Sequence, residues 1–308
     1  MQKLRLCQQM ENMKKIIVII IIIIALFLLI LFLWPKNIYQ FKGNTLNYAS
    51  DRGKTDYEIL SQETNGSIDI YRLRFKSRNF LDNPTIIYGL LFIPENKSNI
   101  PGIVFLPAGQ ATKEARSTFL MEIAKQGYAA LAIDQRGIGE TGGAYLSFEQ
   151  DYQVFLEKKE PIQHLAVYDA LRAFDVMREF KNINKGSIGF VGESMGGRYA
   201  IIATALEKRA KGVIAISASG FHIPINQEKG NNYMVSIDPD NYISTISPNQ
   251  VIMLHGTNDS VVELEDAKIT FEKAKEPKKF FTAEGCDHGY CDKMWNELKS
   301  DLGIMLNS

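Results

Sequence analysis

The sequence has no excess of charge of either sign, and it has few cysteines and histidines. Its 308 residues contain 35 lysines and arginines against 35 aspartates and glutamates, and no long stretch carries charges of one sign only. A protein that binds nucleic acid needs a basic face to neutralise phosphates, so this balance argues against such a partner. Three cysteines and four histidines leave few candidates for a metal site or for histidine-dependent catalysis. The chain also lacks internal repeats.

One long hydrophobic run stands near the N-terminus, IIVIIIIIIALFLLILFLW at Ile16–Trp34. As a helix it would span about 28 Å, close to the ~30 Å hydrocarbon core of a bilayer, and it has no polar side. A cleaved signal peptide is the nearest alternative, but the run is longer than a usual signal and no small-residue cleavage site follows it. We therefore predict a transmembrane signal anchor at residues 16–34, after a cytoplasmic segment at 1–15.

The charges that flank this segment predict its orientation. Lys14 and Lys15 adjoin its N-terminal end, whereas the lysines that follow it, Lys36 and Lys42, are more widely spaced. Because basic residues accumulate on the cytoplasmic side, the N-terminus is expected inside and the bulk of the chain outside. We predict a single-pass protein of the cell membrane with an extracytoplasmic folded domain.

After a polar tether expected at residues 35–56, the chain from 57 to 308 has the pattern of one α/β domain. Six short apolar runs alternate with helical patterns; they are GIVFL, AALAI, SIGFV, GVIAIS, VIML and KFFTA, which begin at Gly102, Ala129, Ser187, Gly212, Val251 and Lys279. Runs that are apolar on both faces are typical of parallel strands covered on both sides. Before them, Asp69–Phe75 and Thr85–Phe92 indicate an antiparallel pair. We predict a mostly parallel, eight-stranded sheet flanked by helices.

A long helix is predicted between two of these strands, at Gln163–Phe180. Residues such as Leu171 and Phe174 recur at helical spacing and give one apolar face. Polar residues such as Asp169 and Asp175 fall on the opposite face, as expected for a helix that covers a sheet.

A serine between two glycines follows the strand SIGFV. Gly192, Ser194 and Gly196 fit the pattern Gly-x-Ser-x-Gly, and a helical pattern comes next. A turn from strand to helix that presents a serine hydroxyl must be sharp, and a Cβ two residues to either side would clash. Gly192 and Gly196 remove those clashes, although an ordinary strand–helix turn would also accommodate them.

On these residues, the chain from about Tyr57 to its C-terminus resembles the α/β-hydrolase superfamily of serine hydrolases. Within that superfamily it is most similar to esterases and peptidases related to dienelactone hydrolase and prolyl oligopeptidase. The resemblance implies an α/β-hydrolase fold and a catalytic triad in the chain order serine, acid, histidine. Asp259, in HGTND after the strand VIML, takes the position of the acid. His288, before Gly289 and after the strand KFFTA, takes the position of the histidine.

Ser194, Asp259 and His288 are therefore the candidate catalytic residues. A serine hydroxyl is a poor nucleophile at neutral pH and needs a base, and the base needs a carboxylate to fix its tautomer. The alternative interpretation of Asp259 is that it caps a helix that begins near Val262.

The resemblance also implies an oxyanion hole formed by main-chain N–H groups. One of them comes from the residue after the serine, here Met195. The other comes from the stretch VFLPAGQ, where Gln110 or Gly109 has the expected position. Ala108 replaces the histidine that the family often has in this stretch, and this difference removes no main-chain donor. The resemblance implies no metal and no cofactor.

The leading hypothesis is a membrane-anchored serine hydrolase that cleaves carboxylic esters through an acyl-enzyme. A serine peptidase of the same fold is the first alternative, because the same triad also cleaves amides. A non-catalytic binding module is a further alternative. The expected partners are a small-molecule ester or a short peptide, together with the membrane that holds the N-terminal helix. The sequence indicates no oligomeric state.

The C-terminal stretch EGCDHGYC permits another function, because Cys286, His288 and Cys291 are residue types that bind zinc. A closed structural zinc site needs four ligands, however, and Cys7 is expected on the other side of the membrane. If the two nearby cysteines instead form a disulfide, the closed loop around His288 would be stabilised by about 2 kcal/mol.

Overall fold

The computed structural model describes residues 2–33, 39–42, 45–224 and 231–307, and the chain divides into two compact units at 1–38 and 39–308. The first unit consists of helix α1 (Gln2–Leu33), which continues without a break through the expected cytoplasmic segment. Its stretch Asn12–Leu29 has a mean hydropathy of 2.6, and none of that stretch is buried by other parts of the protein. Among the described residues it is the one helix that is long and apolar enough to cross a membrane; Trp34, the last residue of the predicted span, lies outside them.

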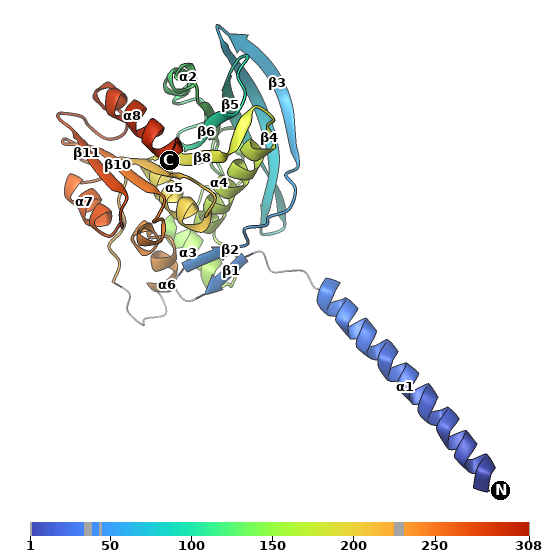
Figure 1. The fold of residues 1–308 in the computed structure, drawn as a ribbon. Coiled ribbons are helices and arrows are strands. Elements are labelled where there is room, and N and C mark those ends of the chain that lie inside the picture. The colour runs from blue at the N-terminus through green and yellow to red at the C-terminus, as the bar shows by residue number, and fades with distance from the viewer. Residues whose placement is uncertain (1, 34–38, 43–44, 225–230, 308) are drawn as a thin grey trace. The chain divides into compact units, whose positions relative to one another are not determined.

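The second unit is built on one sheet of nine strands (Figure 1). In chain order the strands are β3 (Tyr57–Asn65), β4 (Ile68–Phe80), β5 (Asn83–Pro94), β6 (Ile100–Leu106), β7 (Ala129–Ile133), β8 (Ile183–Glu193), β9 (Gly212–Ile216), β10 (Gln250–Gly256) and β11 (Lys278–Ala283). They lie side by side in the order β11-β10-β9-β8-β6-β7-β5-β4-β3. The six strands from β11 to β7 are parallel, and the last three pair antiparallel.

The fold is the mostly parallel α/β sheet that the sequence predicts, with one strand more than expected. All six apolar runs form the parallel strands, and the predicted antiparallel pair forms β4 and β5. The additional strand is β3, which pairs antiparallel with β4 at the edge of the sheet. Most of its side chains are exposed on both faces. Since a strand without a buried face has no hydrophobic alternation, its sequence gives no periodic signal.

Helices cover both faces of this sheet. On one face, α2 (Ser117–Lys125) and α8 (Trp295–Leu306) share a hydrophobic core with residues of β6, β8, β9 and β10. On the other, α4 (Ile162–Glu179) and α5 (Met195–Leu206) pack against each other and against the central strands. The remaining helices are α3 (Phe148–Leu156), α6 (Asn231–Ser236) and α7 (Leu264–Glu272), with short 3₁₀ turns at Gly139–Thr141, Pro239–Asn241, Ile243–Thr245 and Asp292–Met294.

Residues 35–56, which the sequence indicates as a tether, are in part folded into the second unit. The strands β1 (Tyr39–Lys42) and β2 (Thr45–Tyr48) form a two-stranded antiparallel sheet. Leu46 and Tyr48 on β2 are both buried. The prediction of a tether is therefore wrong for β2, which its buried Leu46 and Tyr48 attach to the second unit. Residues 35–38 and 43–44 of the predicted tether lie outside the described residues.

The polar face of α4 is also covered rather than solvated. Asp169 and Arg172 on this face are buried. Arg136, from the loop after β7, donates to both oxygens of Asp169 at 2.6 and 2.7 Å. Arg52, from the expected tether, donates to both oxygens of Asp175 at 2.8 Å. An amphipathic pattern identifies the apolar face of a helix, but it does not show that ion pairs to distant segments cover the polar one.

Candidate active site

Ser194 lies in the turn between β8 and α5, and the residues two positions to either side of it, Gly192 and Gly196, have no side chains. Its φ and ψ are 54° and −120°, which residues with a Cβ rarely adopt. A Cβ on Gly192 would overlap the main chain of Gly196, and a Cβ on Gly196 would overlap the carbonyl of Leu106 on β6. The Ser194 N–H donates to the Ile216 carbonyl at 2.8 Å and so ties the turn to β9. Both glycines therefore meet the steric requirement that the sequence indicates.

Asp259 lies in the loop after β10. Its Oδ1 accepts hydrogen bonds from the N–H groups of Val261 and Val262 at 3.0 and 2.9 Å. Helix α7 begins later, at Leu264, so Asp259 shapes the turn before the helix and does not cap it. Burial by itself would raise the pKa of Asp259, but the Val262 N–H and the His288 ring hold this pKa below its ordinary value.

His288 connects the other two residues. Its Nδ1 is 2.9 Å from each carboxylate oxygen of Asp259, and its Nε2 is 2.9 Å from the Ser194 hydroxyl oxygen. An Nδ1–H that donates to the carboxylate leaves Nε2 as the acceptor for the hydroxyl proton. The structure thus brings Ser194, His288 and Asp259 from three different loops into one hydrogen-bonded chain.

The loop that carries His288 is closed by a disulfide. Cys286 and Cys291 are bonded, with their Cα atoms 6.3 Å apart. A disulfide has no thiolate to bind a metal, so the bond contradicts the hypothesis of a zinc site at this loop. Among the residues that the structure describes, no group of three histidine, cysteine, aspartate or glutamate side chains is placed to hold a metal ion.

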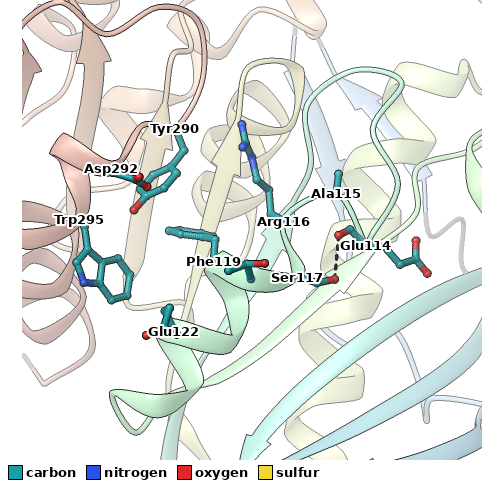
Figure 2. Close-up of a pocket in the computed structure, with 10 residues that line it drawn as sticks. Glu114, Ala115, Arg116, Ser117, Phe119, Glu122, Tyr290, Asp292 and Trp295 are labelled. Atoms are coloured by element: carbon teal, nitrogen blue, oxygen red, sulfur yellow. Dashed lines mark hydrogen bonds between the residues drawn. The ribbon is translucent and has the colours of Figure 1, made fainter. Parts of the chain in front are cut away.

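Two charged residues that the sequence analysis missed hold this loop against the serine turn. Glu193, the last residue of β8, accepts a hydrogen bond from the Tyr290 N–H at 3.0 Å. Arg116 donates from Nε to the same carboxylate at 2.9 Å, and a second bond runs from its Nη2. Figure 2 shows Arg116 beside Tyr290. One feature of the sequence could have identified Glu193: it is an acidic residue at the end of an otherwise apolar strand, directly before Ser194.

The predicted oxyanion donors lie close together. Met195 is the first residue of α5, so its N–H has no acceptor within the helix. A Cβ on Gly109 would lie 3.5 Å from the Met195 side chain. Gln110 has a φ of 64°, and the Ala111 N–H donates to the Ala108 carbonyl at 3.1 Å, so these residues form a tight turn beside α5. The assignment of Met195 and of Gly109 or Gln110 as oxyanion donors stays a prediction.

Two cavities open around these loops. The one at the serine has a volume of about 380 Å³ and is lined by Ser194, Met195, Arg198, Phe221, His222 and Val261, among others. A second cavity, of about 520 Å³, lies between α2 and the start of α8 and includes Phe119, Tyr290 and Trp295 (Figure 2). The first is therefore the candidate substrate site, because it contains the serine.

Comparison with known proteins identifies the family. Residues 35–221, more than half of the chain, match the family model described as acetyl xylan esterase (AXE1). The chain belongs to the acetyl xylan esterase family. Residues 171–299 also match the model described as BAAT / acyl-CoA thioester hydrolase C terminal. The family confirms the predicted α/β-hydrolase superfamily.

Solved structures of low sequence identity share the fold. An acetyl xylan esterase from Paenibacillus sp. R4 has a TM-score of 0.70 at 17% identity, over 83% of this chain and 91% of that one. Acetyl xylan esterase 1 from Thermoanaerobacterium sp. JW/SL YS485 has a TM-score of 0.67 at 14% identity, over 83% and 88%. These similarities confirm the predicted α/β-hydrolase fold.

Curated relatives match over a smaller part. The uncharacterized protein YfhR of Escherichia coli O157:H7 is 27% identical over 148 residues, which are 46% of this chain and 52% of that protein. The putative hydrolase YtaP of Bacillus subtilis (strain 168) is 33% identical over 94 residues, 30% of this chain and 31% of that protein. The match to YfhR thus spans about half of the relative's length.

Proposed function

We propose that this protein is a membrane-anchored serine esterase that hydrolyses short-chain carboxylic esters at Ser194. The observation that carries the proposal is the hydrogen-bonded chain from the Ser194 hydroxyl through His288 to Asp259. A serine with a free base at one side and a carboxylate behind that base has the three parts that acyl transfer requires.

In the first half of the reaction, Ser194 Oγ attacks the ester carbonyl carbon while its proton moves to His288 Nε2. Asp259 stabilises the imidazolium, and its lowered pKa keeps it ionised at neutral pH. The carbonyl oxygen becomes an oxyanion that accepts hydrogen bonds from Met195 and from Gly109 or Gln110. When the intermediate collapses, the bond to the alcohol breaks and the alcohol leaves with the proton from His288, which gives the acyl-enzyme.

In the second half, water attacks the acyl carbon and gives a proton to His288 Nε2. The tetrahedral intermediate breaks its bond to Ser194 Oγ, which takes that proton back, and the carboxylic acid is released. The cycle consumes one ester and one water and restores the hydroxyl, so no cofactor enters the balance.

The acyl group that we propose is small, with acetyl first. The cavity of about 380 Å³ at Ser194 must accept both the acyl group and part of the alcohol. The family model and two of the structural neighbours are named as acetyl xylan esterases, and another neighbour, from Solibacter usitatus, is named as a glucuronoyl esterase. These names support an ester of a hydroxylated compound rather than a peptide.

We also propose that α1 anchors the enzyme with its N-terminus in the cytoplasm and the second unit outside. The apolar stretch of α1 and the paired lysines before it, Lys14 and Lys15, support this orientation. The disulfide between Cys286 and Cys291 supports it independently, because such bonds persist in oxidising compartments. A membrane-impermeant maleimide is expected to label Cys7 only after cells are permeabilised; labelling in intact cells would reverse the orientation.

The test of the catalytic proposal uses the full chain in detergent and a fluorophosphonate probe. Wild type is expected to be labelled and to hydrolyse p-nitrophenyl acetate faster than longer acyl esters or peptide amides. Ser194→Ala is expected to lose both labelling and hydrolysis, whereas Ser61→Ala, an exposed serine on β3, keeps both. Equal labelling of wild type and Ser194→Ala would refute the proposal, and preferential cleavage of amides would make the enzyme a peptidase.

A further inference from the structure

One cation in the substrate cavity, Arg198, has no partner among the residues that the structure describes. Arg198 lies in the first turn of α5, and its N–H donates to the carbonyl of Ser194, the residue directly before the helix, at 3.2 Å. Both line the cavity of about 380 Å³. The Nη1 atom of Arg198 is buried and makes no hydrogen bond. A charged group in the same cavity as the nucleophile is therefore available to a ligand.

Two aromatic rings hold the Arg198 guanidinium in place. Its central carbon is 4.5 Å from the ring centre of Phe221 and 5.6 Å from that of Phe148. The two rings themselves pack edge to face, with their centres 5.6 Å apart. Cation–π contacts of this kind orient a guanidinium without neutralising its charge or satisfying its N–H groups.

Acidic residues nearby do not pair with Arg198 in the part of the chain that the structure describes. Asp238 acts on it by charge, but the oxygens of Asp238 accept N–H groups of Phe221, Ile223 and Asp240 instead. Asp266 also lines the cavity, but its Oδ1 lies 3.5 Å from His222 Nε2 and it does not pair with Arg198. Burial lowers the pKa of Arg198, which reflects the cost of a cation that no carboxylate contacts.

Among the described residues, the three most deeply buried arginines are each paired with a carboxylate. Arg52 and Arg172 contact Asp175, and Arg136 contacts Asp169. Leaving a buried charge without a counterion is costly. Arg178 also has one buried nitrogen without a partner, its Nε, but it lines a different cavity, so Arg198 is the unpaired arginine that shares a cavity with Ser194 in the part of the chain that the structure describes. The difference is explained if the counterion of Arg198 arrives with the ligand.

We infer that Arg198 is a specificity-determining residue that binds a carboxylate carried by the ester substrate. This inference rests on the proposed esterase activity at Ser194. A guanidinium forms two parallel hydrogen bonds with a carboxylate, which makes that anion its best-matched ligand. Both side chains line one cavity, so a single small substrate can place its ester carbonyl at Ser194 and its carboxylate at Arg198. The preferred substrates are thus anionic esters, with the charge on either the acyl or the alcohol part.

The experiment compares charged esters with neutral amides of the same shape, using the full chain in detergent. On the acyl side the pair is monomethyl glutarate and methyl glutaramate; on the alcohol side it is the acetyl esters of 4-hydroxybutanoate and 4-hydroxybutanamide. In wild type, kcat/KM is expected to be about 10- to 100-fold higher for the anion of one pair, which identifies the side that carries the charge. In Arg198→Met this ratio of kcat/KM values is expected to fall to about one. In Arg198→Lys it is expected to lie between the wild-type ratio and that of Arg198→Met. Arg74→Met, an exposed arginine on β4, is the matched control and keeps the wild-type ratio.

A binding measurement separates this inference from the esterase proposal. Glutarate is expected to bind Ser194→Ala by calorimetry and to lose at least tenfold in affinity in Ser194→Ala/Arg198→Met, whether or not any ester is hydrolysed. Folding of each variant is checked by its melting temperature, which removal of an unpaired charge is not expected to lower. An anion-to-amide ratio near one in wild type for both pairs, or an unchanged ratio in Arg198→Met, overturns the inference. Absence of all ester hydrolysis, together with glutarate binding that depends on Arg198, overturns the esterase proposal alone.

Discussion

At the scale of single residues, the serine turn shows how strictly sterics select an amino acid. Ser194 keeps a φ of 54° because β8 and α5 enclose it on both sides and leave no room to relax. Gly196 is needed for a different reason, since its backbone lies directly against the Leu106 carbonyl. The fixed backbone of this turn therefore sets the position of the Ser194 hydroxyl relative to His288.

Gly196→Ala is expected to lower the free energy of unfolding by more than about 2 kcal/mol and to abolish hydrolysis, because the new methyl group overlaps a strand carbonyl. Urea denaturation and p-nitrophenyl acetate assays measure the two effects. Gly186→Ala is the matched control, since a Cβ there approaches only the Asn184 side chain, at 3.5 Å. A stable, active Gly196→Ala enzyme would contradict the geometry of the turn.

At the scale of elements, the first turn of α4 contains a buried histidine whose protonation is costly. His164 is fully buried, its Nε2 lies 2.6 Å from the Ser236 hydroxyl, and burial lowers its pKa to about 3. In the unfolded chain a histidine titrates near 6.5. Below that pH the unfolded state binds a proton that the folded state does not, so stability is complete above about 6.5 and falls as the pH decreases toward 3.

We expect the free energy of unfolding to fall by up to about 1.4 kcal/mol per pH unit in this range through His164 alone. His164→Gln keeps a polar partner for Ser236 and removes the titration, so its stability should depend less on pH between 6.5 and 4.5. Denaturant titrations at several pH values measure the two slopes. Equal slopes in wild type and variant would show that His164 does not contribute.

The loop from Cys286 to Cys291 is a second element whose chemistry affects the site. Reduction of the disulfide is expected to lower kcat/KM about tenfold, because His288 must stay within hydrogen-bond reach of both Ser194 and Asp259. The melting temperature should change by only a few degrees, since closing a loop this short contributes about 2 kcal/mol. Cys286→Ser/Cys291→Ser tests this without a reductant, and Cys7→Ser is the control. Free thiols at both positions in protein from native membranes would refute the idea.

At the scale of the whole molecule, the chain divides at residue 38, between its apolar helix and the catalytic unit. The stretch that follows is structural: Leu46 and Tyr48 are buried, and Arg52 contacts Asp175 and Glu207. Tyr48 also donates from its hydroxyl to the His164 carbonyl at 2.9 Å, so β2 is bonded to α4 as well as packed. The unit that should fold by itself therefore begins before the first strand of the large sheet.

A chain that begins at Tyr39 is expected to be soluble without detergent and to keep its kcat/KM within about twofold of the full chain. A chain that begins at Tyr57 should lose several kcal/mol of stability, because it leaves two apolar pockets empty and the carboxylates of Asp175 and Glu207 without Arg52. Melting temperatures and sedimentation of the two truncated chains distinguish these outcomes. Equal stability of both would restore the interpretation of residues 39–56 as a tether.

The sequence by itself determined the fold class and the six parallel strands and, through its resemblance to the α/β-hydrolases, the three residues of the candidate triad. Each of these leaves a local signal: an apolar run for a buried strand, a pair of glycines for a sharp turn, and a position after a strand for a loop residue. The apolar helix at the N-terminus is equally local, because a continuous hydrophobic run needs no partner to be recognised.

Only the tertiary structure decided which side chains of distant segments contact one another. The attachment of β2 to α4, the buried polar face of α4 and the Glu193–Arg116 pair depend on contacts between residues far apart in the chain. The isolated charge of Arg198 is of the same kind, since an arginine on a helix looks alike in sequence whether or not a carboxylate meets it. Charges and polar groups find their partners across space, so their roles follow from packing and not from local sequence.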